Sequence, residues 1–227
     1  MASSEDSSLS RRERERQARR ATMLRAAETV FAQKGYTHAT LDEIAERAEF
    51  GKGTLYNYFE GGKEEILFAV LDTVYDEVHD LVTSSFAEAC HGRTLRACYR
   101  DMVKRAITFY QEREDLFVIL IKEAYRMCFS HDETKVAYFQ RQRARIVNTL
   151  MPALEHAVSE GTIRDLPLHS VAHMLIENVD GLIVHRIMVN HNTQTTMCEH
   201  GFMLDEPEEA ADFLTAMLFD GLGTSAL

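Results

Sequence analysis

Side chains that can hydrogen-bond to and stack on nucleic acid are concentrated in one short stretch of this chain. Residues 52–59, Lys-Gly-Thr-Leu-Tyr-Asn-Tyr-Phe, follow residues 40–48, Thr-Leu-Asp-Glu-Ile-Ala-Glu-Arg-Ala, after a turn at 49–51. Within 52–59 two apolar residues four apart, Leu55 and Phe59, pack inward. They leave an outward face of polar, small and aromatic residues, Lys52, Gly53, Tyr56 and Asn57. Two short helices joined by a tight turn in this way form the helix-turn-helix that enters the major groove of DNA.

The neighbouring residues indicate where the helices of this region begin and end. Thr40 and Glu43 form a capping box, which starts a helix at residue 41. A preceding helix ends at Gly35, which is suited to the left-handed conformation after a helix. That helix carries apolar residues at helical spacing, Met23, Leu24, Ala27, Val30 and Phe31. A long helix follows from Lys63 to about residue 89, so the sequence predicts a small helical head that presents one helix to a partner.

Positive charge gathers in the same part of the chain. The 227 residues carry a net charge of −11. Residues 1–63 contain 11 basic and 10 acidic residues, whereas residues 64–227 contain 14 basic and 26 acidic ones. Within residues 9–34 the basic residues outnumber the acidic ones by 8 to 3, which favours contact with phosphates there. A basic N-terminal region that can bind DNA, followed by a larger acidic region, indicates a DNA-binding regulator.

The rest of the chain also predicts helices. Apolar stripes recur at helical spacing in about 94–112, 115–128, 133–160, 168–190 and 207–222. No strand-like alternation is long enough to indicate a sheet, so the predicted fold class is all-α. We expect a disordered tail over residues 1–17, a DNA-binding domain over 18–78 with its helix-turn-helix at about 41–60, and a C-terminal body over 79–227.

The motif positions resemble the TetR family of bacterial transcriptional regulators. The resemblance covers about residues 20–80 and rests on several runs: Ala26-Ala27, Val30-Phe31, Lys34-Gly35-Tyr36, Ile44 to Ala48, Lys52 to Phe59 and Lys63-Glu64-Glu65. It implies a homodimeric repressor with two helix-turn-helix heads on a palindromic operator in double-stranded DNA. It also implies a helical body that binds a small-molecule inducer, which changes the head spacing and releases the DNA.

The resemblance further implies roles for individual residues of the head. Four positions match residues that face base edges: Gly53, Thr54, Tyr56 and Asn57. Four others match phosphate anchors: Thr40, Lys52, Tyr58 and Lys63. Their chemistry agrees, because Asn57 can pair with adenine, Gly53 lets the backbone approach the groove wall, and a helix N-terminus attracts phosphate.

Three features depart from the family pattern. Glu49 occupies a turn position usually held by glycine, so it must adopt a left-handed backbone or shift the turn. Gly51 stands where a Ser-type N-cap is usual, and it is a somewhat weaker cap. One extra residue separates Phe59 from Lys63, which shifts Lys63 relative to the usual phosphate anchor.

Two groups of residues in the body are candidates for the effector site. The middle helices concentrate aromatic and flexible apolar side chains that suit an apolar or aromatic ligand, among them Phe117, Ile121, Tyr125 and Phe139. The 168–190 helix is apolar on most sides and should be largely buried, with a polar stripe of His173, Glu177 and Asp180. A buried carboxylate there needs a partner, which a cationic or donor group of the ligand or a nearby base would supply. Plain core packing for the first group stays open, as does a solvated edge or a salt bridge at a dimer seam for the second.

Other kinds of site have weaker support. The four cysteines show no metal-binding spacing. A Cys-x-His pattern and two further histidines are a weak signal for metal, haem or redox sensing: His185, His191, Cys198 and His200. We find no nucleophile-base-acid set, phosphate loop, HExxH motif, signal peptide or membrane-spanning apolar run. We therefore expect a cytoplasmic protein that is not an enzyme and uses no cofactor or metal.

Two other functions compete with ligand-responsive repression. One is a metal-, haem- or redox-sensing regulator of the same fold, and the other is an effector-free architectural DNA-binding protein. We expect a homodimer sealed by the helices at 168–190 and 207–222. Their pairing would form a four-helix bundle around Gly181, Leu182, Phe213, Leu214, Met217 and Leu218.

Overall fold

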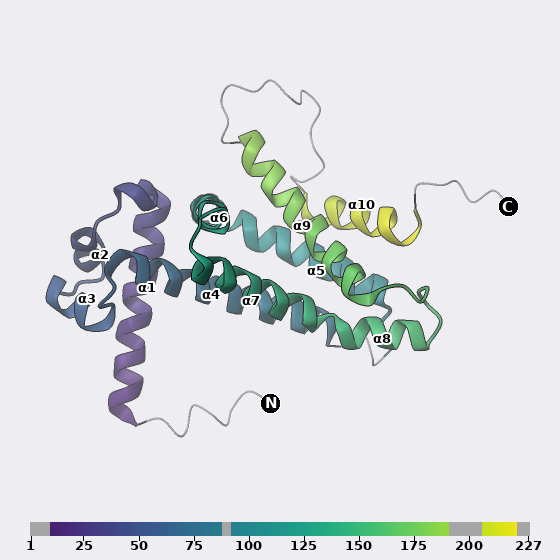
Figure 1. The fold of residues 1–227 in the computed structure, drawn as a ribbon, viewed down its shortest axis with the longest axis horizontal. Helices are drawn as coiled ribbons and strands as arrows, with labels where there is room; N and C mark the ends of the chain where they lie inside the picture. The colour runs from purple at the N-terminus through teal and green to yellow at the C-terminus, as the bar shows by residue number, and fades with distance from the viewer. Residues whose placement is uncertain (1–9, 88–91, 191–205, 222–227) are drawn as a thin grey trace. The chain divides into compact units, whose positions relative to one another are not determined.

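The computed structural model describes residues 10–87, 92–190 and 206–221, and this part of the chain contains helices and no strands (Figure 1). The predicted all-α class is confirmed. The chain divides into two compact units, residues 1–74 and 75–227. Helix α4 (Gly62–Phe86) begins in the first unit and ends in the second. Among the described residues, no helix is long and apolar enough to cross a membrane.

The first unit consists of α1 (Arg11–His38), α2 (Leu41–Arg47), α3 (Lys52–Tyr58) and the first turns of α4. Ser10 starts α1 through a capping box with Glu13, so residues 11–17, which the sequence assigns to the tail, are helical. The helical geometry of α1 breaks at Gly35, where φ is 73° and ψ is 160°. The sequence predicts that the helix ends at this glycine; the backbone does break there, but α1 continues to His38.

A small apolar core holds these helices together. Its members come from all four helices and from the residue after α3, and each is at most 1% exposed: Met23, Ala27, Phe31, Ile44, Leu55, Phe59, Ile66 and Leu67. Burial of this many apolar side chains is the main force that keeps the short α2 and α3 helical, because helices of seven residues are unstable alone.

The second unit contains the end of α4 and six further described helices. These are α5 (Leu95–Gln111), α6 (Glu114–Cys128), α7 (Glu133–Thr149), α8 (Met151–Ser159), α9 (Leu168–Asn190) and α10 (Pro207–Phe219). Helix α10 packs against α5, and Figure 1 shows the two helices side by side. The core takes fully buried side chains from α5, α8, α9 and α10, among them Tyr99, Met102, Leu154, Ala172 and Ala211.

Two expectations about this unit are wrong. The segment 133–160 is not one helix, because it divides at Leu150 into α7 and α8. Pro152 lies in the first turn of α8, and a proline lacks the N–H that a continuous helix would need there. Helix α9 is not buried on most sides, because Met174 is 57% exposed and Met188 is 62% exposed.

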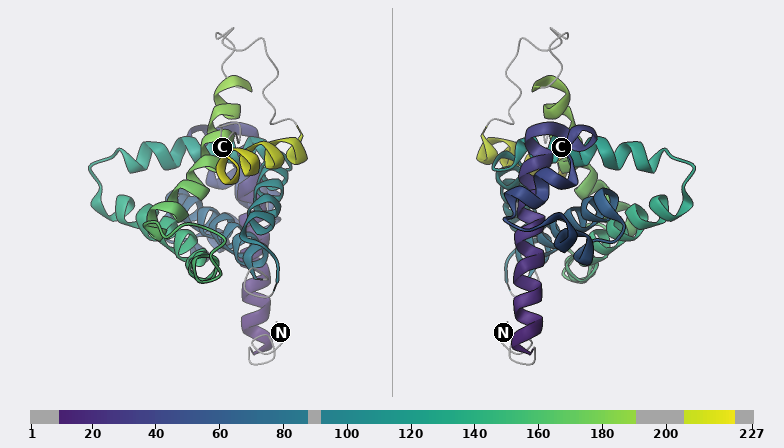
Figure 2. Two further views of the ribbon diagram at one scale, coloured as in Figure 1. Left: turned by 90° about the vertical axis from the view of Figure 1, so that its right-hand side faces the viewer. Right: turned by 90° about the vertical axis from the view of Figure 1, so that its left-hand side faces the viewer.

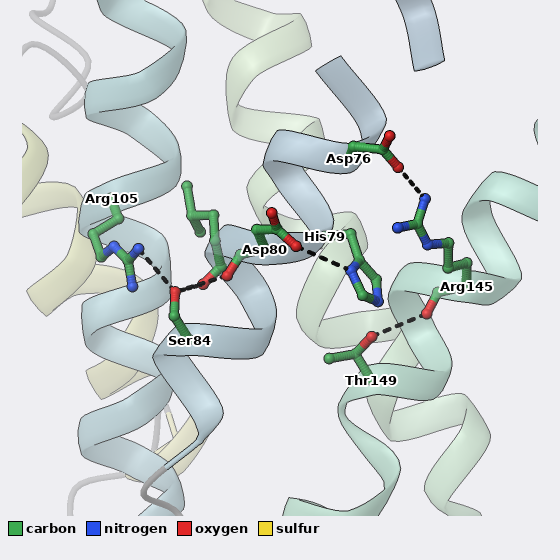
Figure 3. Close-up of polar contacts among 8 residues, drawn as sticks. Asp76, His79, Asp80, Ser84, Arg105, Arg145 and Thr149 are labelled. Carbon is green, nitrogen blue, oxygen red and sulfur yellow. Dashed lines mark hydrogen bonds and ion pairs between the residues drawn. The ribbon is translucent and has the colours of Figure 1, made fainter. Parts of the chain in front are cut away.

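Polar contacts fasten the second half of α4 to its neighbours (Figure 3). On one side Arg105 of α5 donates to the Ser84 hydroxyl at 3.0 Å and to the Ser85 hydroxyl at 2.9 Å. On the other side Arg145 of α7 pairs with Asp76 at 2.5 Å. The part of α4 that belongs to the second unit is therefore held by two different helices.

Candidate nucleic-acid interface

The turn between α2 and α3 has the geometry that a helix-turn-helix needs. The Thr40 hydroxyl accepts from the Glu43 amide at 3.3 Å, and the Glu43 carboxylate accepts from the Thr40 amide at 3.1 Å. The predicted capping box is therefore confirmed. Glu49 adopts the left-handed backbone with φ of 60°, which resolves the choice between a strained residue and a shifted turn. Gly51 is the N-cap of α3 and supplies no side-chain hydrogen bond.

Helix α3 has one buried and one exposed face. Leu55 and, just after the helix, Phe59 are each 1% exposed, as the spacing predicts. The opposite side is open: Lys52, Gly53, Tyr56 and Asn57 are exposed, and Thr54 and Tyr58 are half-buried. With Thr40, these six residues make seven of the eight that the sequence assigns to DNA, and they lie at the start of α2 and along α3; the eighth is Lys63 of α4.

Gly53 is a glycine that nothing inside the head requires. A Cβ built on it meets no atom within 4 Å, and its φ is not positive. Glycine inside a helix costs up to about 1 kcal/mol relative to alanine. The head therefore tolerates a destabilising residue at an exposed position, as expected where a partner approaches the backbone closely.

Ion pairs fix α2 to the helices on either side of it. Lys52 at the start of α3 lies 2.9 Å from the Asp42 carboxylate, and this pair raises the pKa of the lysine. Lys34 of α1 lies 2.5 Å from the Glu43 carboxylate and lowers the pKa of that group. Both pairs are well exposed, so they orient the helices more than they stabilise them.

Lys63 lies in a different environment from the other predicted phosphate anchors. Its ammonium group donates to the carbonyl oxygens of Tyr36, Thr37 and Ala39 at 2.8, 3.1 and 2.9 Å. It also lies 4.7 Å from the centre of the Tyr36 ring. These contacts close the end of α1, because the last carbonyls of a helix have no partner within it. All three ammonium protons are used inside the head.

Two arginines of α1 lie over aromatic rings at the end of α3. The Arg16 guanidinium carbon is 5.7 Å from the centre of the Tyr58 ring, and that of Arg20 is 5.2 Å from the centre of the Phe59 ring. Such contacts are attractive because the face of an aromatic ring is electron-rich. They place the N-terminal half of α1 next to the end of α3.

In the second unit the predicted polar stripe of α9 has a partner that sequence reasoning missed. Arg143 of α7 pairs with both Glu177 and Asp180, and its distance to Asp180 is 2.5 Å. Burial raises the pKa of Asp180, and Arg143 opposes that rise. His173 of the same predicted stripe is exposed. No local signal identifies Arg143, since it lies 34 and 37 residues from its partners.

The predicted aromatic residues fall into separate groups. Phe117 packs edge-on against Phe109 and Tyr110 with ring centres 5.4 and 5.7 Å apart, and Ile121 packs beside them. Phe139 packs against Tyr138, which also touches Tyr75 of α4. Tyr125 is 50% exposed and stacks on Phe129, so this pair faces solvent.

The histidine and cysteine signal falls mostly beyond the described residues. His191, Cys198 and His200 lie outside them, and His185 of α9 is half-buried. Within the described ranges, no group of three or more His, Cys, Asp or Glu side chains is placed to hold a metal ion.

Comparisons with known proteins agree with this geometry. Residues 23–70 match the family model of bacterial regulatory proteins, tetR family. The chain is 29% identical to the probable HTH-type transcriptional regulator ArpR of Pseudomonas putida over 182 residues. This aligned stretch covers 76% of this chain and 82% of ArpR. The chain is 23% identical over 199 residues to the HTH-type transcriptional repressor NicS of another P. putida strain, covering 86% and 87% of the two chains.

A solved structure extends the likeness in fold over both units. The transcriptional regulator FadR of Bacillus subtilis, solved in complex with stearoyl-CoA, superposes with a TM-score of 0.70 at 16% identity, covering 89% of this chain and 99% of that one. The helix-turn-helix geometry and the family match over residues 23–70 identify the DNA-binding head as that of the TetR family of transcriptional regulators, and the solved structure extends the likeness over the second unit in fold alone.

Proposed function

We propose that the protein is a repressor that binds a palindromic operator as a homodimer and is released by a small apolar effector. The observation that carries the proposal is the open face of α3. It presents Gly53, Tyr56 and Asn57 to solvent, and the glycine has no use within the head. A helix that offers donors, acceptors and a glycine to the outside is suited to the major groove.

We assign base recognition and phosphate binding to different residues of this face. Asn57 and Thr54 offer the groups that distinguish bases, because an amide can pair with adenine and a threonine offers a hydroxyl and a methyl. Thr40, Lys52 and Tyr58 hold phosphates around them. Lys63 acts through the end of α1, since its ammonium group is occupied by three carbonyls.

The effector site lies in the second unit, near the ion pairs between α7 and α9. One guanidinium, Arg143, faces two carboxylates, Glu177 and Asp180, so the cluster has a net charge of −1. Protein atoms desolvate Asp180 enough to raise its pKa, yet 46% of its side chain is reached by solvent. An apolar ligand with a cationic or donor group would compete with Arg143 for these carboxylates.

Helix α4 offers a route from effector to head, because it belongs to both units. In the second unit it is held by Arg105 and Arg145 (Figure 3) and by Arg113, which pairs with Glu77 at 2.6 Å. An effector that moves α5, α6 or α7 would shift α4 through these contacts. Release of DNA requires only that the effector bind the DNA-incompetent arrangement more tightly.

The dimer is assigned to α9 and α10, which expose apolar side chains: Met174, Met188, Val189 and Phe213. Single exposed apolar residues are common, but several on the two helices predicted to form the interface support an interface. Leu214 is 2% exposed and belongs to the core of its own chain, so it is a poor candidate for the seam. Light scattering at micromolar concentration tests this assignment, and a stable monomer would contradict it.

DNA reading is tested by selecting bound genomic fragments and measuring variants on the recovered site. Asn57→Ala should lose about 1–3 kcal/mol on that site and relax the preference at one base pair. Lys52→Ala should weaken binding to all sequences and lower the salt slope by about one unit. An unchanged sequence preference in Asn57→Ala would show that α3 faces the DNA differently.

Release is tested with three probes on the protein–DNA complex: a lipophilic cationic dye, an uncharged aromatic compound and stearoyl-CoA. The last is included because the B. subtilis neighbour was solved with it. We expect the cationic dye to release DNA and Glu177→Gln to blunt the release while operator affinity is kept. Release by stearoyl-CoA alone, with no effect of Glu177→Gln, would exclude this effector class.

A further inference from the structure

The N-terminal half of α1 projects from the head without a core of its own. In Figure 2 this part of α1 extends beyond the other helices of the head. Every residue from Arg11 to Arg20 is exposed, and the first buried residue of the helix is Met23. These ten residues contain six arginines and two glutamates. They form nearly three turns, which no tertiary packing of apolar side chains supports. We call residues 11–20 the arginine overhang.

The arginines of the overhang are arranged on one face. At 100° per residue, Arg12, Arg16 and Arg19 fall within 60° of one another. Further along α1 the same face carries Met23, Ala27 and Val30, which are buried in the head. The stripe is therefore the continuation of the core-facing side of α1, with arginine in place of apolar residues.

Contacts within the head confirm which way this face points. Arg16 lies over the Tyr58 ring and Arg20 over the Phe59 ring, and both rings belong to the end of α3. The stripe therefore starts beside the helix that reads DNA. From Arg20 to Arg12 it extends along α1 for about 12 Å, at about 1.5 Å per residue.

The overhang's own carboxylates leave the stripe positively charged. Glu13 is held in the capping box with Ser10. Glu15 pairs with Arg11 at 3.0 Å. Among the described residues, neither Arg12 nor Arg19 has an ion-pair partner. A row of arginines without carboxylates, beside a DNA-reading helix, is complementary to the sugar-phosphate backbone.

We propose that Arg12, Arg16 and Arg19 bind phosphates of the DNA that flanks the bases read by α3. The overhang thus lengthens the footprint of each head and adds affinity that does not depend on sequence. The inference rests on the proposed orientation of α3 toward DNA. It adds a second contact surface, outside the helix-turn-helix, made by residues that the head's own core does not use.

The test compares two faces of the same overhang. Arg12→Gln/Arg19→Gln removes two charges from the stripe, whereas Arg14→Gln removes one from the opposite face, about 140° to 160° away. All three residues are exposed, so the fold is kept, as circular dichroism would verify. Affinity is measured from about 0.1 M to about 1 M salt, on the selected operator and on a random duplex of equal length.

The double variant should lower the salt slope by about 0.9 for each phosphate that is no longer bound, or about two units per head. At about 0.1 M salt each bound head should lose roughly sixtyfold in affinity for either duplex, which multiplies to about 4,000-fold for a dimer with both heads bound, and the difference should vanish near 1 M. Arg14→Gln should change the slope by clearly less than half of that amount. Trimming the operator ends should weaken the wild-type protein but not the double variant.

Three outcomes would overturn the proposal. The double variant could keep the salt slope of the wild-type protein. Arg14→Gln could also lower the salt slope by as much per removed charge as the double variant does. Alternatively, the double variant could bind DNA normally and lose binding to vesicles of anionic phospholipid, which would assign the stripe to a membrane surface. A wild-type protein that binds no duplex would instead contradict the proposed function itself, so the two failures are distinguishable.

Discussion

The two units use their charged side chains in different ways. In the second unit arginines join helices to one another: Arg100 of α5 pairs with Asp212 and Glu208 of α10, and Arg143 of α7 pairs with two carboxylates of α9. In the first unit Arg12 and Arg19 have no ion-pair partner among the described residues, and Asn57 is open to solvent. These arginines of the second unit organise the protein itself, whereas Arg12 and Arg19 of the first unit are available to a partner.

The apolar cores do not differ in this way. Phe59 in the first unit and Tyr99 in the second are both at most 1% exposed. Folding in each unit is therefore driven by apolar burial, and the charged groups decide what the folded unit contacts. Three changes to the protein or its solvent test this difference between the units, starting with the core of the head.

The largest effect is expected for Phe59→Ala. Removing a fully buried phenyl ring costs about 3–5 kcal/mol, which is a large part of the stability of a unit this small. We expect the head to unfold and DNA binding to be lost while the second unit stays folded. Hydrogen exchange resolved along the chain measures both units in one experiment.

The matched control is Phe129→Ala, since Phe129 is 81% exposed and the same atoms are removed. It should leave the exchange protection of both units unchanged. If Phe59→Ala unfolds α5 to α10 together with the head, the two units form one cooperative structure, and the difference drawn between them does not hold.

A smaller effect, with opposite signs for folding and binding, is expected for Gly53→Ala. The added methyl meets no atom within 4 Å and replaces a poor helix former, so the head should gain up to about 1 kcal/mol of stability. Operator binding should weaken by about 1–3 kcal/mol, because the methyl would stand between α3 and the groove wall. Thermal melting measures the expected gain in stability, and a DNA-binding titration measures the expected loss of operator affinity. A variant that is more stable and binds equally well would show that no partner approaches this glycine.

Much of the head could be predicted from local sequence. The Thr40 capping box, the break at Gly35 and the buried pair Leu55 and Phe59 each depend on residues within one or two helical turns. Such features follow from hydrogen-bonding and periodicity alone. Glu49 was also recognisable as the point of strain, and its φ of 60° is the left-handed alternative.

The second unit shows where local patterns stop being informative. The periodicity of 168–190 identifies a helix with the bounds of α9, but it does not say that Met174 and Met188 stay exposed. Nor does it find Arg143 as the partner of Glu177, because that pairing depends on how α7 packs against α9. The same limit applies to the use of Lys63 at the end of α1, which joins residues 24 to 27 positions apart. Contacts of this kind are set by packing geometry rather than by spacing in the sequence.

The smallest effect is expected from acid on α10. Three carboxylates that hold this helix to α5 have pKa values below their ordinary 3.8 or 4.5: Asp212 and Glu208 because of Arg100 and Lys104, and Asp220 because of Arg96. A carboxyl group whose pKa is lower in the folded chain stabilises it above the unfolded value, and that contribution is lost as the pH falls toward the folded one. The loss should therefore begin below about pH 4.5 and continue below about pH 3.8.

All three carboxylates are exposed, so each pair contributes little, and α10 should loosen rather than unfold while its buried Ala211 and Leu214 hold it in place. Hydrogen exchange of α10, corrected for the intrinsic effect of pH, should show protection falling in this range. In Arg100→Gln part of that loss should already be present at neutral pH, and the remaining dependence on acid should be weaker. If wild-type α10 kept its protection down to about pH 3, the arginines would not be holding it, and the arginines of the second unit would not have the joining role that distinguishes them from Arg12 and Arg19.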